Sequence, residues 1–208
     1  MTARDEILAA VREAVREAPR GHRPAPQPTT PVSDRAVLLD RFAERVADYR
    51  AKVIRCEASE VPVHVLSALR DARRVLLPAG LPEAVVDSVT DRFGEGMVAS
   101  DSTDCADLEG FDAVVTTCAA GIAATGTVVL DHGDGQGRRA LTLLPDLHVC
   151  IVRSGQVVQD VPHAVRRLDP RRPQTWISGP SATSDIELDR VEGVHGPRTL
   201  VVLLVGDR

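Results

Sequence analysis

The stretch Trp176-Ile-Ser-Gly-Pro-Ser-Ala-Thr-Ser-Asp-Ile-Glu187 is followed by Gly193-Val-His-Gly-Pro197 and by the apolar run Leu200-Val-Val-Leu-Leu-Val205. Apolar residues lead into Gly-Pro and then into small hydroxyl residues and acids. This pattern predicts a strand, a tight turn and the start of a helix. A helix start exposes unpaired backbone N–H groups, which suit an anionic or carbonyl-bearing small molecule. A plain helix cap between two core strands is the structural alternative, because every helix needs a cap.

Short apolar segments alternate with helical segments over most of the remaining chain. The predicted strands are 52–56, 74–78, 96–100, 111–117, 125–130, 139–144, 147–152, 175–178 and 200–205, and the predicted helices are 34–49, 61–71, 82–92 and 161–168. Strands separated by helices in this way are typical of an α/β fold whose sheet is mainly parallel. Asp160 is expected to cap the last helix, with Pro162 in its first turn.

Residues 125–130 and 139–144 are expected to form a β-hairpin around the turn 131–137. That turn contains Gly133-x-Gly135-x-Gly137. A dinucleotide-binding loop of this type lies between a strand and a helix, whereas here a second strand is expected to follow. The glycines are therefore interpreted as the flexible tip of a hairpin.

Length and composition predict one α/β domain preceded by a helical arm. The 208 residues are 43% hydrophobic but only 2% aromatic, so the core must consist mainly of Val, Leu, Ile and Ala. Residues 2–18 form an amphipathic helix pattern, and five prolines between positions 19 and 31 indicate an extended linker. We expect the arm and linker to occupy 1–32 and the domain to occupy 33–208.

Charge and cysteine spacing argue against several classes of function. The net charge is −5 with both signs interspersed, so no basic stripe indicates nucleic-acid binding. No run approaches the roughly 20 apolar residues of a membrane span, and the charged opening is unlike a secretory signal. A cytoplasmic location is therefore expected. The four cysteines lack C-x-x-C spacing, so no zinc or iron–sulfur site is predicted.

Two histidines are the first candidates for chemistry. His148 opens a buried strand, and His195 lies between glycines, where backbone segments approach closely. Each is expected either to line a cleft or to serve as a local hydrogen-bonding group. No H-x-H or H-E-x-x-H pattern occurs, so no metal site is predicted from the histidines. Ser181 and Thr183 are further candidate hydroxyls, with no base fixed beside either.

Four segments resemble the LUD-domain family, and in particular its lactate-utilization protein C group. They are Ala124-Thr-Gly-Thr-Val-Val-Leu130, Leu144-Pro-Asp-Leu-His-Val149, Ser178-Gly-Pro-Ser-Ala-Thr-Ser-Asp-Ile-Glu187 and Val191-Glu-Gly-Val-His-Gly-Pro197. The resemblance covers roughly residues 111 to 206. It implies a three-layer α/β/α fold similar to the NagB/RpiA/CoA-transferase-like group, with a mainly parallel sheet plus a β-hairpin.

The resemblance also implies a part in oxidising L-lactate to pyruvate, beside two iron–sulfur partners, lactate-utilization proteins A and B. This chain departs from the family at Ala124, where many relatives carry Glu, so proton chemistry by that side chain is missing. A backbone-binding role for Thr125, Gly126 and Thr127 is still expected.

Two hypotheses of function follow. In the first, the protein binds a small organic acid or an anionic cofactor, whose identity the sequence leaves unknown. The turn holding Gly179, Pro180, Ser181 and Thr183 would bind the anion, and His148, His195 and Asp185 would act in catalysis. In the second, the protein is a non-catalytic assembly or regulatory subunit of the same system. A CoA-transferase activity ranks last, because Ala124 offers no carboxylate nucleophile.

Overall fold

The computed structural model describes residues 2–17, 34–94, 98–99, 105–183, 191–192 and 196–206. Its helices are α1 (Ala3–Glu17), α2 (Arg35–Asp48), α3 (Val61–Ala68), α4 (Glu83–Phe93), α5 (Cys105–Leu108) and α6 (Val161–Arg167). Its strands are β1 (Lys52–Cys56), β2 (Val75–Leu76), β3 (Val98–Ala99), β4 (Ala113–Thr117), β5 (Ala120–Ile122), β6 (Thr127–Leu130), β7 (Leu147–Arg153), β8 (Val157–Val158), β9 (Thr175–Ile177), β10 (Ala182–Thr183), β11 (Val191–Glu192) and β12 (Thr199–Val205).

A six-stranded parallel sheet forms the centre of the domain, with strand order β1-β12-β7-β4-β2-β3. Strands β7 and β12 pair along their whole length, from Leu147 opposite Thr199 to Arg153 opposite Val205. Both strands are buried over most of their length, which is why they appear in the sequence as continuous apolar runs rather than alternating ones.

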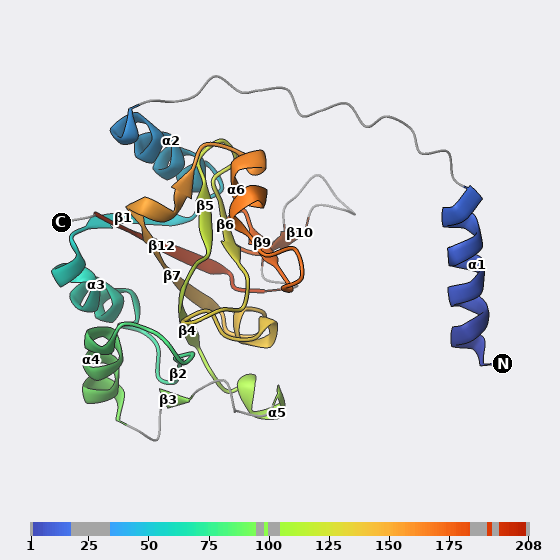
Figure 1. Ribbon diagram of the computed structural model, residues 1–208. Coiled ribbons are helices and arrows are strands. Elements are labelled where there is room, and N and C mark those ends of the chain that lie inside the picture. Colours follow the sequence, from blue (N-terminus) through green and yellow to red (C-terminus); the bar gives the residue numbers. More distant parts are fainter. Residues whose placement is uncertain are drawn as a thin grey trace.

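Successive residues of β12 pack into two different cores. Val201 and Leu203 belong to a cluster with residues of α3 and α4, whereas Val202 and Leu204 belong to a cluster with residues of α2. This separation follows from the pleat of a strand, which turns neighbouring side chains to opposite faces. Figure 1 shows α3 and α4 together on one side of the sheet and the second sheet on the other.

The second layer is a four-stranded mixed sheet with order β8-β5-β6-β9. Helix α2 packs with this sheet against the central one, and α6 covers its outer face through Ala164 and Leu168. The predicted cap of α6 is confirmed, because the Asp160 carboxylate accepts a hydrogen bond from the His163 backbone N–H at 3.0 Å. The expectation of an α/β fold with a mainly parallel sheet and a hairpin is also confirmed.

The hairpin itself differs from the prediction in its second strand. Strand β6 pairs with β5 in an antiparallel hairpin, whereas residues 139–142 form a 3₁₀ helix. The predicted strand at 139–144 is therefore wrong. Its place beside β6 is taken, because β5 and β9 occupy both edges of β6. The helix predicted to begin near 184–187 lies outside the described residues.

Helix α2 holds the hairpin and the segment after β9 by close backbone contact. A Cβ atom on Gly126, at the hairpin turn, would lie 2.5 Å from the Arg45 carbonyl oxygen. A Cβ atom on Gly179 would lie 2.6 Å from the Tyr49 Cβ. Both glycines have positive φ, at 60° and 84°, so each position excludes a side chain for two reasons.

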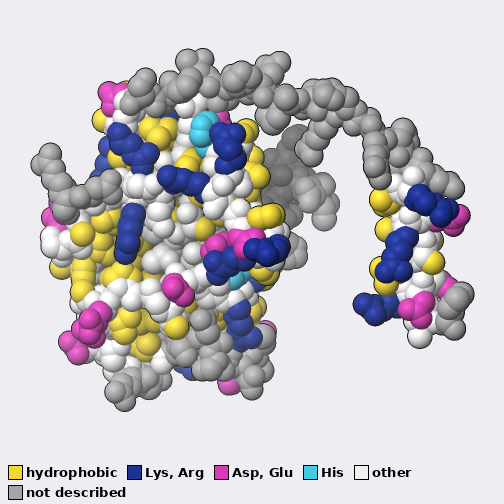
Figure 2. Space-filling view, in the orientation of Figure 1, with side chains coloured by type: hydrophobic (Ala, Val, Ile, Leu, Met, Phe, Trp, Pro, Cys, Tyr) yellow, Lys and Arg dark blue, Asp and Glu magenta, His cyan; other side chains and the backbone are white. Residues whose placement is uncertain are grey.

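Helix α1 exposes its apolar residues. Ile7, Val11 and Val15 are 63%, 52% and 67% exposed, and Figure 2 shows hydrophobic side chains on the surface of this helix. Within the ranges that the structure describes, no helix is long and apolar enough to cross a membrane.

Substitution of Gly126 tests the contact between the hairpin and α2. We expect Gly126→Ala to lower the free energy of unfolding by about 1–2 kcal/mol for the left-handed backbone and by a further ~1–3 kcal/mol for the clash with α2. Gly94→Ala is the matched control, because Gly94 also has positive φ but nothing lies within 4 Å of its added Cβ. Equal losses for the two variants in urea denaturation would contradict the close contact.

Candidate functional site

The first cavity lies where β7 and β12 begin, and we call it the amino-edge cavity. It has a volume of about 290 Å³. Its lining comprises Arg139, Thr142, Leu143, His148, Thr175, Trp176, Ile177, Ser178, Gly179, Pro180, Ser181, Gly196, Pro197 and Leu200. Three segments distant in the sequence therefore meet here: the start of β7, the turn after β9 and the segment before β12.

A row of hydroxyl groups connects the hairpin turn to this cavity. The Oγ1 atoms of Thr125 and Thr127 are 2.7 Å apart, and Thr127 Oγ1 is 2.8 Å from the Oγ of Ser178, which lines the cavity. The Thr127 hydroxyl thus contacts the cavity lining, and the Thr125 hydroxyl bonds to Thr127 behind it. Gly126 instead packs the hairpin turn against α2 and is not part of the lining.

The turn after β9 uses part of its backbone for its own structure. The Ser181 N–H donates to the Pro197 carbonyl at 2.8 Å, and Thr183 pairs with Val191 between β10 and β11. Pro180 has no N–H to donate. The predicted cradle of backbone N–H groups is therefore partly engaged, whereas Ser178 and Ser181 bring side-chain hydroxyls to the lining.

His148 is almost completely buried, with 1% of its surface exposed. Its Nε2 lies 2.7 Å from the Oγ1 of Thr116, on the neighbouring strand β4. Burial disfavours the charged imidazolium and lowers the pKa of His148 from 6.5 to about 4. At neutral pH the ring is therefore uncharged, and it suits hydrogen bonding better than proton donation from an imidazolium.

Arg139 adds a positive charge to the amino-edge cavity. Its Nη1 donates to the Thr175 hydroxyl at 3.0 Å, and its other guanidinium donors allow additional hydrogen bonds. Guanidinium groups bind carboxylates in a bidentate geometry. Arg139 was not among the predicted site residues, because residues 139–144 were expected to form the second strand of a hairpin rather than a 3₁₀ helix beside the cavity.

Asp185 and His195, two of the three predicted catalytic residues, lie outside the described residues. Of the predicted binding residues, Thr183 is described in its backbone only. No group of three or more His, Cys, Asp or Glu side chains suited to a metal occurs among the residues that the structure describes.

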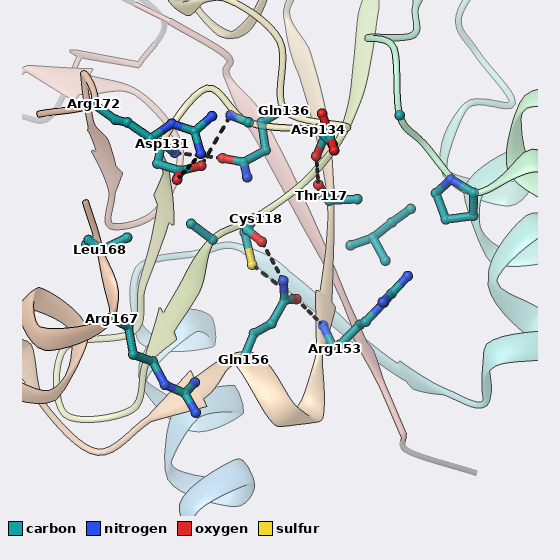
Figure 3. A pocket seen from close by; sticks show the side chains of 15 residues that line it. Thr117, Cys118, Asp131, Asp134, Gln136, Arg153, Gln156, Arg167, Leu168 and Arg172 are labelled. Carbon is teal, nitrogen blue, oxygen red and sulfur yellow. Dashed lines mark hydrogen bonds and ion pairs between the residues drawn. The ribbon is translucent and has the colours of Figure 1, made fainter.

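A second cavity, which we call the carboxyl-edge cavity, lies at the opposite edge of the central sheet. It has a volume of about 450 Å³. Residues that follow β2, β4 and β7 line it, and Figure 3 shows ten of its side chains with labels. The lining comprises Gly80, Pro82, Thr117, Cys118, Ala119, Asp131, Gly133, Asp134, Gln136, Ile151, Arg153, Gln156, Arg167, Leu168 and Arg172.

Interlocked loops build the wall of this cavity. The Gly135 N–H donates to the Ala79 carbonyl and the Thr117 N–H donates to the Gly135 carbonyl, both at 2.7 Å. A Cβ atom on Gly135 would lie 2.8 Å from the Thr117 hydroxyl oxygen. The glycine-rich turn predicted as a flexible hairpin tip is thus packed between the ends of two strands, which requires glycine at this position.

Gln156 links the end of β4 to the end of β7 by hydrogen bonds. Its Nε2 donates to the Cys118 carbonyl at 2.6 Å, and its Oε1 accepts the Arg153 N–H at 2.9 Å. Beside it, the Cys118 thiol is buried, and hydrogen bonding to Cys150 together with burial raises its pKa well above 9.0. This thiol stays protonated at neutral pH and is therefore a poor nucleophile.

Three arginines and two aspartates set the charge of the carboxyl-edge cavity. Arg172 forms an ion pair with Asp131 at 2.9 Å, and Arg167 donates to the Gly155 carbonyl at 3.0 Å. Arg153 extends from the end of β7, and Asp134 completes the charged set. No residue of this charged set was predicted from the sequence to be part of a site. The signal that could have found it was the position of these residues after the carboxyl ends of parallel strands.

Comparisons with known proteins agree with this architecture. A family model described as the LUD domain matches residues 39–205. This range includes the four segments that resemble the family and also the N-terminal half of the domain. A protein of Deinococcus radiodurans named Lactate utilization protein C is 44% identical over 208 residues, covering 97% of this chain and 94% of that protein. One of the same name from Halalkalibacterium halodurans is 38% identical over 95 residues, covering 42% of this chain and 41% of that protein.

A solved structure is also similar. The crystal structure of a DUF162 family protein from Deinococcus radiodurans, at 1.70 Å resolution, superposes with a TM-score of 0.69 at 42% identity. The similarity covers 83% of this chain and 99% of that one.

The buried neutral state of His148 predicts a pH dependence of stability. Its folded pKa of about 4 lies below the ordinary value of 6.5, so the unfolded chain binds more protons between these values. Stability from this residue is complete above about pH 6.5 and is lost as the pH falls toward 4, by on the order of 3 kcal/mol. Urea denaturation of the wild type and of His148→Asn across this range should show a shallower decline for the variant. Parallel declines would contradict the assignment.

Proposed function

The chain belongs to the LUD domain family, and from that membership we propose that it is a component of a lactate-utilization system that binds a small hydroxy or keto acid. The ligand occupies the amino-edge cavity. The finer proposal is that the system oxidises L-lactate to pyruvate together with two iron–sulfur partners, lactate-utilization proteins A and B.

The convergence of the family segments carries this proposal. The four segments that resemble the family are spread over about a third of the chain, yet residues of three of them line one cavity. The fourth, Ala124–Leu130, contacts the lining through the hydrogen bond between Thr127 and Ser178. Local folding does not require segments so far apart to meet, so their meeting supports a shared ligand.

The lining suits the carboxylate and the adjacent oxygen of a three-carbon acid. Arg139 binds the carboxylate, and the hydroxyls of Ser178 and Ser181 bind its oxygens. Neutral His148 contributes a hydrogen bond at the C2 oxygen. Asp185 and His195 are retained from the sequence as the proposed acid–base residues.

Oxidation of lactate releases two electrons and two protons. This chain lacks the C-x-x-C spacing typical of iron–sulfur ligands, so in the proposed system the electrons pass to the iron–sulfur partners. The contribution of this chain is then to bind and orient the acid. The substitution of Ala124 for the family's Glu fits a role in binding through hydroxyls rather than proton transfer at that turn.

Calorimetry with L-lactate and pyruvate tests the proposed ligand. We expect at least one of the two acids to bind the full-length protein. Loss of the charge-assisted hydrogen bonds in Arg139→Gln should raise its Kd by about 10- to 100-fold. Arg70→Gln is the control, because Arg70 is exposed and forms an ion pair with Asp71 away from this cavity. Failure of both acids to bind, even with the two partner proteins present, would overturn the proposal.

A second candidate function is supported by the surface of α1. Its apolar residues are exposed, and an uncharged His148 is poorly suited to acid catalysis, so the chain would instead assemble or regulate the iron–sulfur partners. In this case the arm is essential and the amino-edge cavity is not.

Growth on L-lactate as the sole carbon source separates the two functions. If the chain binds the acid, the double variant His148→Asn, Asp185→Asn should abolish growth of a complemented deletion strain. Deletion of residues 1–30 should then reduce growth much less. The opposite pattern, with growth lost only on deletion of the arm, would favour the assembly function. Immunoblots must show equal protein levels in all strains, because an unstable variant would also fail to support growth.

A further inference from the structure

We propose that the carboxyl-edge cavity is a second binding site, for a small molecule that carries a terminal oxyanion group. The position of the cavity in the sheet is the first argument. After β2 the chain continues outward to β3, whereas after β4 it continues in the other direction to β7. The loops that follow β2 and β4 therefore diverge, and ligands of open α/β sheets bind in the crevice at such a switch point.

This site is separate from the amino-edge cavity. His148 lies near the start of β7 and Arg153 at its end, so about 16 Å of extended strand separates them. The two cavities have no lining residue in common. None of the residues that line the carboxyl-edge cavity belongs to the four segments that resemble the family.

The cationic groups determine the class of ligand. Arg153, Arg167 and Arg172 come from the end of β7, the end of α6 and the turn before β9, and all three line one cavity (Figure 3). Arg167 donates one hydrogen bond to the Gly155 carbonyl, and Arg172 donates one to Asp131. Each guanidinium has five N–H donors, so further donors can bind a ligand. A phosphate ester or a carboxylate presents the oxygen acceptors that such groups bind.

Fixed polar groups and size define the rest of the ligand. Gln156 is held by two hydrogen bonds, and the wall beside it is backbone that interlocked glycines bring close. A volume of about 450 Å³ exceeds the needs of a three-carbon acid and falls in the range of pockets for cofactor-sized molecules. The carboxyl-edge cavity therefore has room for a ligand larger than the acid proposed for the amino-edge cavity.

Asp131 modulates the charge of the site. Its Oδ2 pairs with Arg172, while its Oδ1 accepts the Gly133 N–H at 3.2 Å. Asparagine at this position keeps an oxygen for Gly133 but removes the charge that competes for Arg172. Asp131→Asn should therefore strengthen oxyanion binding, which a purely structural ion pair would not do.

Calorimetric titration of the full-length protein with phenyl phosphate and with benzoate tests the site. The two probes share a ring and differ in the oxyanion, so the tighter one distinguishes a phosphate ester from a carboxylate as the natural group. We expect Arg167→Gln to raise the Kd of the bound probe by about 10- to 100-fold. Arg166→Gln, at the adjacent position of α6 but outside the lining, should leave it unchanged.

The same titration contains the outcomes that would overturn the proposal. Failure of both probes to bind at millimolar concentration, or an equal loss of affinity in Arg166→Gln and Arg167→Gln, would exclude a specific site. A Kd that rises in Arg139→Gln but not in Arg167→Gln would place the probe in the amino-edge cavity instead. Circular dichroism and thermal melting of each variant show whether it is folded, and Asp131→Asn supplies a test in which affinity rises.

Discussion

Burial of β7 and β12 on both faces is the constraint around which this domain is arranged. Each strand presents apolar side chains alternately to two cores, so both faces need a covering layer. Helices α3 and α4 cover one face. On the other, α2 and a second sheet share the task, and they fit only because Gly126 and Gly179 allow the backbones to approach.

The same parallel arrangement produces two distinct edges with different chemistry. At the amino edge, the loops that enter β7 and β12 meet the end of β9, and hydroxyl groups, Arg139 and a neutral histidine line a small cavity. At the carboxyl edge, the chain leaves β4 and β7 for the second sheet, and Gln156 joins the two exits. Arginines from three segments surround the larger cavity there. One sheet thus separates a proposed site for a small acid from a proposed site for a larger anion.

Two titratable groups deep in the domain, His148 and Cys118, are held in their neutral forms. Burial keeps the His148 imidazole uncharged, and burial with hydrogen bonding keeps the Cys118 thiol protonated. The charged groups of both cavities are instead arginines and aspartates, several of them exposed and engaged by hydrogen bonds or an ion pair. Such an arrangement is typical of recognition of an anion.

The sequence by itself determined the longer helices and the long buried strands, because these depend on local periodicity and on turn residues. The sequence alone showed the apolar run at 200–205, the Asp160 cap and the family segments. These features led to the correct fold class and family. The period of a pattern does not say which strands become neighbours. Residues 139–144 were therefore expected beside β6, whose edges β5 and β9 occupy.

Only the tertiary structure decided where the cavities lie. His148 and Ser181 were predicted to serve one site, and both line the amino-edge cavity, but Arg139 joins them from a 3₁₀ helix that no pattern predicted. The turn at 131–137 was expected to be a free tip, and contacts with Gly80 and Thr117 made it a wall instead. The physical reason is that a cavity is made by residues distant in sequence, and their meeting depends on the packing of whole layers rather than on any local preference.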